Sequence, residues 1–157
     1  MSAVDIAMQI KEVDEGFSET PYYDTKRIPT YGHGFVCGKQ NGPLPKISIT
    51  LDESLKRLRG MAEVNEKTFL GNPDLFRAYK NCNNVQKAVL LSMAHQLGIY
   101  GVILFKGMLN ALAKKDFELA AKECLDSKAA RTDAPKRFIR NAQMLKTGEL
   151  HDYYKSA

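Results

Sequence analysis

The segment from residue 17 to residue 49 differs in composition from the sequence on either side, and this contrast limits the folds open to the chain. Proline and glycine recur through it, at Pro21, Pro29, Gly32, Gly34, Gly38, Gly42, Pro43 and Pro45. Short strand-like runs lie between them, over 28–31 and 34–37, and the stretch 38–46 is typical of a turn-rich loop. The flanking sequences have helical periodicity instead. The pattern predicts a small sheet within a mostly helical chain.

Helix-start signals border this segment on both sides. Two pairs resemble N-terminal capping pairs, namely Ser2 with Asp5 and Thr50 with Glu53. The first pair predicts a helix over about 3–14 that ends near Glu15. The second predicts a long helix from 51 to about 68.

The remaining sequence is helical in pattern to its end. Asn84 predicts the start of a helix through Leu97 that is apolar on most sides, with Gly98 as its terminator. Such a helix is expected at the centre of the helical part. Shorter helices are predicted from Pro73 and over about 102–113, 117–125, 134–145 and 149–155.

Two carboxylates and a hydroxyl lie close together in the first part of the chain. Asp24 follows Glu15 by nine positions, and Thr30 follows Asp24 by six. Cleavage of a glycosidic bond needs one protonated carboxyl to donate to the leaving oxygen and one ionised carboxylate to activate a water. A hairpin that folds back toward the end of the first helix would bring these groups together.

The sequence around these three residues resembles the active-site segment of phage lysozymes, a family of glycoside hydrolases typified by the lysozyme of T-even phages. The resemblance is carried by the runs 14–17, 22–25 and 29–34, in which Glu, Asp and Thr fall at the spacing of that family. It extends over nearly the whole chain, including the stretch 85–105, and is weakest over 38–80.

The resemblance implies an α+β fold that is mainly α. It would be a lysozyme-like two-lobed fold with a small antiparallel sheet lobe, a long connecting helix and a larger helical lobe. The chain would then form a single domain over 1–157. The sheet lobe would span about 15–60, and the helical lobe about 1–14 plus 61–157, with the first helix packed in the helical lobe.

The resemblance also implies catalytic roles. Glu15 is the expected general acid, Asp24 the base that positions the attacking water, and Thr30 a hydrogen-bond partner of that water from the opposite side. The reaction is expected to invert the anomeric carbon. From the residues alone, each has an ordinary structural role as well, because Asp is common in turns and Thr in strands.

Four further residues match cleft positions of the family. Gln96, Tyr22 and Gly34 match substrate-contacting or cleft-wall positions, and Arg137 matches an arginine that pairs with the catalytic glutamate. Such a pair favours ionisation of Glu15, whereas burial and the negative end of a helix dipole oppose it. The sequence leaves open which effect wins.

Three positions depart from the family pattern. Phe35 stands where the family has a histidine, so any salt bridge through that histidine is lost. Lys26 stands where the T-even enzyme has an acidic residue, and His95 where it has an aromatic one. The expectation for His95 is a partly buried polar residue.

The resemblance implies an endolysin, a muramidase that hydrolyses the β-1,4 bond between N-acetylmuramic acid and N-acetylglucosamine of peptidoglycan for host lysis. A lytic transglycosylase, which needs only the glutamate, is an alternative, and a chitinase is a further one. A non-catalytic peptidoglycan-binding module is an alternative from another class. A basic nucleic-acid binder is disfavoured, because no helix gathers the charges with interleaved aromatic residues.

Composition adds bounds on partners and setting. The net charge of +5 suits a polyanionic partner such as a cell wall. No Cys or His spacing indicates a metal site, and no cofactor is expected; the three cysteines are expected to be reduced. The N-terminus does not resemble a signal peptide or a membrane anchor. We therefore expect a monomer in the host cytoplasm that needs a holin or a virion to reach peptidoglycan in the periplasm.

Overall fold

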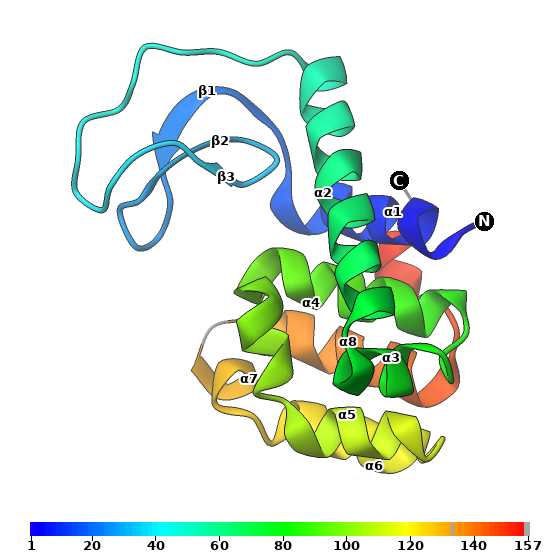
Figure 1. Ribbon diagram of the computed structural model, residues 1–157. Coiled ribbons are helices and arrows are strands. Elements are labelled where there is room, and N and C mark those ends of the chain that lie inside the picture. The colour runs from blue at the N-terminus through cyan, green and yellow to red at the C-terminus, as the bar shows by residue number, and fades with distance from the viewer. Residues whose placement is uncertain (133, 156–157) are drawn as a thin grey trace.

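The computed structural model describes residues 1–132 and 134–155 and is mainly helical (Figure 1). The helices are α1 (Ala3–Glu15), α2 (Leu51–Gly71), α3 (Pro73–Tyr79), α4 (Asn84–Ile103), α5 (Lys106–Ala113), α6 (Phe117–Leu125), α7 (Lys128–Thr132), α8 (Pro135–Thr147) and the short 3-10 helix η1 (Asp152–Tyr154). The strands are β1 (Ser18–Tyr23), β2 (Pro29–Gly32) and β3 (Phe35–Val36). This composition confirms the predicted α+β, lysozyme-like fold class.

The strands form one antiparallel sheet in the order β1-β2-β3. Tyr22 of β1 pairs with Thr30 of β2, which pairs in turn with Val36 of β3. The register of β1 against β2 is irregular between Ser18 and Tyr22. Thr30 therefore lies in the middle strand, directly across from Tyr22.

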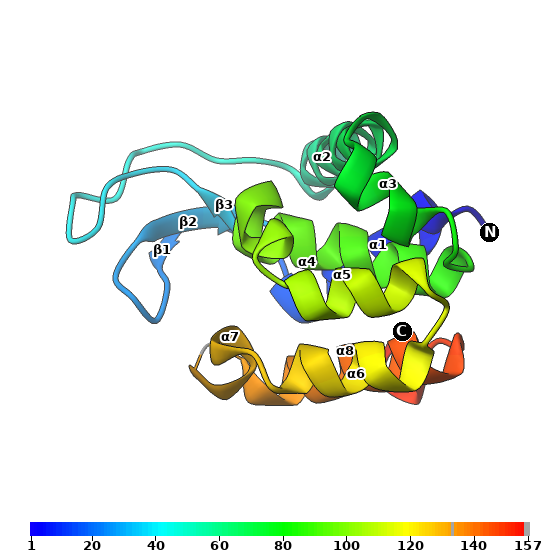
Figure 2. The same cartoon turned by 60° about the horizontal axis from the view of Figure 1, so that its bottom comes forward.

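The sheet and the loop that follows it lie to one side of the helices, and α2 runs from that loop back to the helical part (Figure 1). In the second view, α4 and α5 lie above a layer formed by α6, α7 and α8 (Figure 2). The first helix packs against α4, as expected, although it precedes the sheet in the chain. Residues 88–94 of α4 are all buried, so this helix is the centre of the helical part. The proposed lobe boundaries stay a prediction.

Local signals placed most helix ends correctly. Both capping boxes form, at Ser2 with Asp5 and at Thr50 with Glu53. The N-cap of α4 is Asn83 rather than Asn84, because its side chain accepts a hydrogen bond from the backbone of Gln86. Gly98 does interrupt the helix, with φ 77° and ψ 164°, but helical structure resumes beyond it.

Near the C-terminus one prediction was wrong and one helix was missed. The helix expected over 149–155 is reduced to η1, whose start is capped by the His151 side chain. The short helix α7 was missed, although Ser127 marks its start by accepting a hydrogen bond from the backbone of Ala130. Its five residues are too few to show helical periodicity.

Among the described residues, no single helix has both the length and the apolar character needed to cross a membrane. The pair α4 and α5 meets that test together, across a bend of 95°.

Candidate active site

Glu15 is the last residue of α1, as predicted. The chain leaves the helix at Gly16, where φ is 62° and the backbone N–H still donates to the carbonyl of Glu12. The Glu15 side chain is 19% exposed, so it is largely but not fully withdrawn from solvent. Its position at the end of a packed helix fixes its direction toward the sheet.

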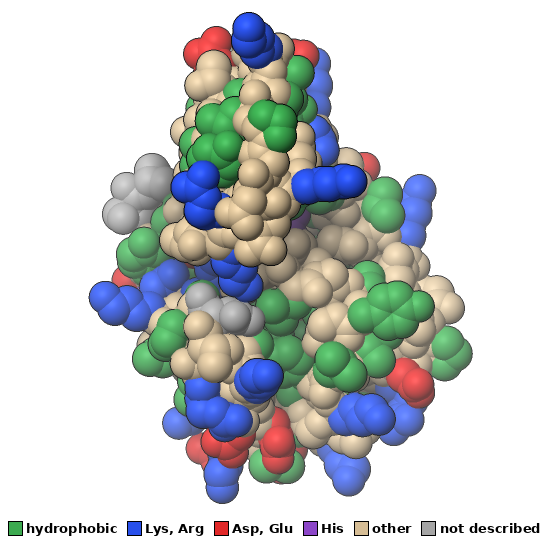
Figure 3. Space-filling view, turned by 90° about the vertical axis from the view of Figure 1, so that its left-hand side faces the viewer, with side chains coloured by type: hydrophobic (Ala, Val, Ile, Leu, Met, Phe, Trp, Pro, Cys, Tyr) green, Lys and Arg blue, Asp and Glu red, His purple; other side chains and the backbone are tan. Residues whose placement is uncertain are grey.

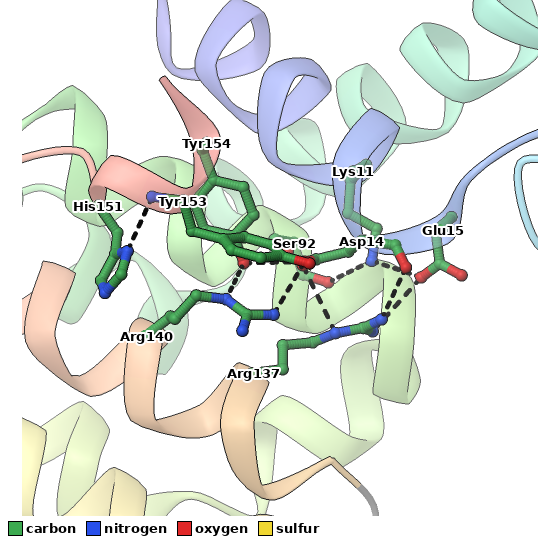
Figure 4. Close-up of polar contacts among 9 residues, drawn as sticks. All are labelled: Lys11, Asp14, Glu15, Ser92, Arg137, Arg140, His151, Tyr153 and Tyr154. Atoms are coloured by element: carbon green, nitrogen blue, oxygen red, sulfur yellow. Dashed lines mark hydrogen bonds and ion pairs between the residues drawn. The ribbon is translucent and has the colours of Figure 1, made fainter. Parts of the chain in front are cut away.

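Two cations contact the Glu15 carboxylate. Lys11 Nζ lies 3.0 Å from Oε1, and Arg137 of α8 lies 3.4 Å from the same oxygen (Figure 4). Arg137 also donates to the carbonyl of Asp14 at 3.2 Å. The expected pairing of Arg137 with Glu15 is therefore present, whereas the contact with Lys11 was not anticipated.

The competition over the protonation of Glu15, which the sequence left open, is decided by these cations. Burial is the largest single influence and raises the pKa of Glu15, but the surrounding groups, with the charges of Lys11 and Arg137 first and the hydrogen bond from Lys11 after them, together outweigh it. The net result is a Glu15 pKa below its ordinary value. In the free protein Glu15 is thus held as a carboxylate.

Asp14 ties the end of α1 to the C-terminal elements. Its side chain is fully buried and accepts a hydrogen bond from the Tyr154 hydroxyl at 2.8 Å. Arg140 lies 3.3 Å from one carboxylate oxygen, and Arg137 lies 3.5 Å from the other. This network fixes α8, and with it Arg137, against the helix end that carries Glu15.

Sequence reasoning missed most of this network. Asp14 was noticed only as the first residue of the run 14–17, and Arg140 was given no role at the site. Lys11 had a readable signal, since it precedes Glu15 by four positions on the same helix face. Nothing local pointed to Tyr154, because it is 140 positions from Asp14.

Asp24 shapes the turn between β1 and β2. Its Oδ1 accepts hydrogen bonds from the backbone N–H groups of Lys26 and Ile28, both at 2.8 Å. The side chain therefore performs the turn role that was the alternative interpretation from sequence. Both bonds use one oxygen, so the turn does not require the other.

Thr30 and Tyr22 lie side by side across the hairpin. The Thr30 side chain is buried, and its hydroxyl donates to the carbonyl of Ile28 at 2.8 Å. Burial raises the pKa of the Tyr22 hydroxyl, and the charges of Glu15 and Asp24 raise it further. Both carboxylates therefore lie near enough to this hydroxyl for their charges to act on it, Glu15 from the end of α1 and Asp24 from the turn after β1.

Gly34 lies directly against the catalytic candidate. Its φ is 81°, and a Cβ placed there would lie 2.6 Å from Oε2 of Glu15. Glycine is required at this position both by the left-handed backbone and by the close approach of the carboxylate. Gly34 therefore forms part of the wall around Glu15.

Gln96, His95 and Phe35 are the other positions that the sequence singled out, and each has a definite environment. The Gln96 side-chain oxygen is buried and accepts no hydrogen bond from the described residues. Burial, together with the charge of Lys11, lowers the pKa of His95 to about 4, so His95 is neutral at neutral pH. In place of a salt bridge, Phe35 has the Arg57 guanidinium 4.3 Å from its ring centre.

No group of three or more His, Cys, Asp or Glu side chains within the described parts of the chain is arranged to hold a metal ion.

A small antiparallel sheet beside a helical body, with a carboxylate at the end of the first helix and a second one in the facing hairpin, defines a lysozyme-like protein. No protein-family model matches the chain. Probable T4-type lysozyme 1 of Dictyostelium discoideum is 31% identical over 122 residues, which are 78% of this chain and 69% of that protein. The pre-baseplate central spike protein Gp5 of Enterobacteria phage T4 is 28% identical over 159 residues, which cover 89% of this chain but 27% of that much longer protein. The chain belongs to the T4-type lysozyme family, and its general function is that of a lysozyme.

Proposed function

We propose that the protein is a muramidase that hydrolyses the β-1,4 bond between N-acetylmuramic acid and N-acetylglucosamine in bacterial peptidoglycan. The observation that carries this proposal is the placement of the Glu15 carboxylate at the end of α1, directly against Gly34 of the small sheet whose first turn carries Asp24. Paired carboxylates on either side of a scissile bond are the groups that glycoside hydrolysis uses.

Glu15 is the proposed general acid. It is ionised in the free protein, so it must gain a proton when substrate binds. A sugar in the cleft would displace water from the exposed part of the carboxylate and strengthen the effect of burial, which already raises its pKa. The protonated carboxyl would then donate to the leaving glycosidic oxygen.

Asp24 and Thr30 are proposed to hold the attacking water. The Thr30 hydroxyl donates its own hydrogen to Ile28, so toward a water it acts as an acceptor. A water that donates one hydrogen to Thr30 and the other to Asp24 presents its lone pair to the anomeric carbon. Inversion follows if the two carboxyl groups leave room for that water, at a separation of about 6.5–9.5 Å.

Substrate binding is proposed to use Tyr22, Gly34, Gln96 and Arg137. Gln96 is included because it matches a substrate-contacting position of the family, and its side-chain oxygen is buried without a protein donor among the described residues. Arg137 is held against Glu15 and Asp14, so its part is chiefly to position the acid. Lys and Arg side chains lie on both parts of the face in Figure 3, and the net charge of +5 favours an anionic wall.

The biological setting that we propose is lysis of a bacterial host by a phage endolysin. The similarity to a phage T4 spike protein supports a phage origin, and equally fits a virion-borne enzyme. In the free form, the enzyme would act on periplasmic peptidoglycan after a holin permeabilises the membrane.

The test is release of reducing ends from purified Gram-negative peptidoglycan by the wild type and by Glu15→Gln. The control is Glu63→Gln, which removes a carboxylate that is exposed on α2. We expect reducing ends from the wild type and the control, and none from Glu15→Gln, with all three proteins folded by circular dichroism.

Mass analysis of the released muropeptides separates the alternatives. Hydrolysis adds one water for each bond cleaved, whereas a lytic transglycosylase adds none and leaves an anhydro sugar at the new end. Products with only anhydro ends would replace the muramidase by a transglycosylase. Binding to peptidoglycan without any release would indicate a binding module instead.

A further inference from the structure

Lys11 is a buried cation on the apolar face of α1. The buried residues of this helix are Ala3, Val4, Ile6, Ala7, Met8, Ile10 and Lys11, and the Lys11 side chain is only 3% exposed. Lysine is rarely buried to this extent, because removing an ammonium group from water is costly unless it is paired and hydrogen-bonded. A buried lysine at this position therefore calls for an explanation.

The Lys11 ammonium has two acceptors, and one of them is the proposed acid. Nζ lies 3.0 Å from Glu15 Oε1 and 3.4 Å from the backbone carbonyl of Ser92 on α4 (Figure 4). The first contact is a charge-assisted hydrogen bond between residues one helical turn apart. The second anchors the amine to the central helix, so the position of Nζ is fixed from two sides.

The surroundings leave Glu15 with an excess of positive charge. On α8, Arg137 is close to it, and on α4 the imidazole of His95 adds positive charge only when the pH falls to about 4. The neighbouring Asp14 carboxylate is already engaged by Arg140 and Arg137. The titratable or charged groups that surround the pair are Asp14 on α1, His95 on α4, Arg137 on α8, and Tyr22 and His33 on the hairpin, with Asp24 beyond Tyr22.

Lys11 and Glu15 each shift the pKa of the other in the direction opposite to the effect of burial. Burial lowers the pKa of Lys11, and Glu15 counters part of that shift. Burial raises the pKa of Glu15, and Lys11 is the first of the charges that reverse it. A general acid must be protonated at the pH where it works, so a cation in contact with it restricts activity at higher pH.

We propose that Lys11 is a positioning residue that sets the upper pH limit of catalysis, by fixing the Glu15 carboxyl group at the end of α1 and holding it ionised until the pH falls. This inference rests on the proposed role of Glu15 as the acid. When Glu15 takes up a proton, Lys11 retains the Ser92 carbonyl as an acceptor, so the pair stays in place during the change. Lys11 is buried behind Glu15 and does not itself reach substrate.

The experiment replaces Lys11 by methionine, which has a similar length and suits the apolar face of α1. Two quantities are measured in the wild type and in Lys11→Met. The first is the pKa of Glu15 in the free protein, from the side-chain carboxyl carbon resonance during an NMR titration. The second is the alkaline limb of the kcat/KM profile on purified peptidoglycan.

The expected result is that both quantities rise in Lys11→Met, and by the same amount. The matched control is Lys56→Met, which breaks a solvated pair with Asp52 of the same helical spacing, 3.3 Å apart and with a lysine that is 80% exposed. In Lys56→Met, neither the Glu15 pKa nor the alkaline limb is expected to move, because Lys56 pairs with Asp52 rather than with Glu15 and solvent screens that pair.

Each other outcome has a distinct meaning. An unchanged Glu15 pKa in Lys11→Met overturns the inference, whatever happens to activity. A raised Glu15 pKa with an unmoved alkaline limb also overturns it, and in addition removes Glu15 from the role of acid. If the wild type releases no reducing ends from peptidoglycan, the proposed function itself is refuted.

A measurement on the wild type keeps the inference testable if Lys11→Met does not fold. The Lys11 side-chain carbon next to Nζ is expected to show a second titration step at the midpoint of Glu15. If the chemical shift of this carbon does not respond to the titration of Glu15, the two groups are not coupled and the inference fails.

Discussion

Replacing Gly34 by alanine tests whether the proposed acid is positioned by its contact with the hairpin. Two consequences follow from the structure. A side chain at a φ of 81° is strained, which costs about 1–3 kcal/mol. The added Cβ would also lie 2.6 Å from Glu15 Oε2, where ordinary contact begins at 3.4 Å, so the carboxylate must retreat by about 0.8 Å.

These two consequences have different readouts. For a protein of this length the strain lowers Tm by about 2–12 °C. Displacement of a catalytic group by about 1 Å lowers turnover by about a hundredfold. Thermal unfolding reports the first effect, and kcat for release of reducing ends from peptidoglycan reports the second.

Gly98→Ala is the matched control. Gly98 has a φ of 77°, and a Cβ there would meet nothing within 4 Å. It shares the backbone strain of Gly34→Ala without touching Glu15. Both variants are expected to lose stability, and only Gly34→Ala to lose kcat. Wild-type kcat in a folded Gly34→Ala protein, or an equal loss in Gly98→Ala, would refute the reasoning.

Three further predictions concern the groups around this contact. Asp14→Asn removes a buried charge that two arginines face, and it should lower the free energy of unfolding, measured in urea, by about 3 kcal/mol. The control Glu118→Gln breaks an exposed pair with Lys146, 3.9 Å apart, and should change that free energy by less than about 0.5 kcal/mol. Thr30→Val suits the strand but removes the acceptor for the water, so kcat should fall about tenfold or more while the fold persists by circular dichroism. The pKa of His95 is about 4 in the folded protein, below its ordinary value of 6.5. As the pH falls from 6.5 to about 4, the unfolded chain therefore gains a proton that the folded protein does not, and the stability decreases. Between about pH 7 and about pH 5, urea unfolding should show that His95→Phe loses about 2 kcal/mol less stability than the wild type, and equal losses would contradict the neutral His95.

Short-range features of the sequence located the centre of the site. The capping pair at Ser2 and Asp5 fixed where α1 begins, and Gly16 fixed where it ends, so the placement of Glu15 followed from local signals. The strand-like runs over 28–31 and 34–37 likewise located β2 and β3, whereas no such run was predicted for β1. These signals work because hydrogen bonds between residues a few positions apart determine helix ends and turns.

The electrostatics of the site were decided by tertiary structure. Arg137 reaches Glu15 from 122 positions away, and its orientation depends on the Asp14 network with Tyr154. The local pair of Lys11 and Glu15 would be a weak solvated contact on an isolated helix, and it becomes influential only because α1 packs on α4 and excludes water. The sequence thus determined which groups the site contains and where the chain presents them. Packing alone decided the charge state of Glu15, because the strength of a charge interaction depends on burial and on partners that sequence neighbours do not reveal.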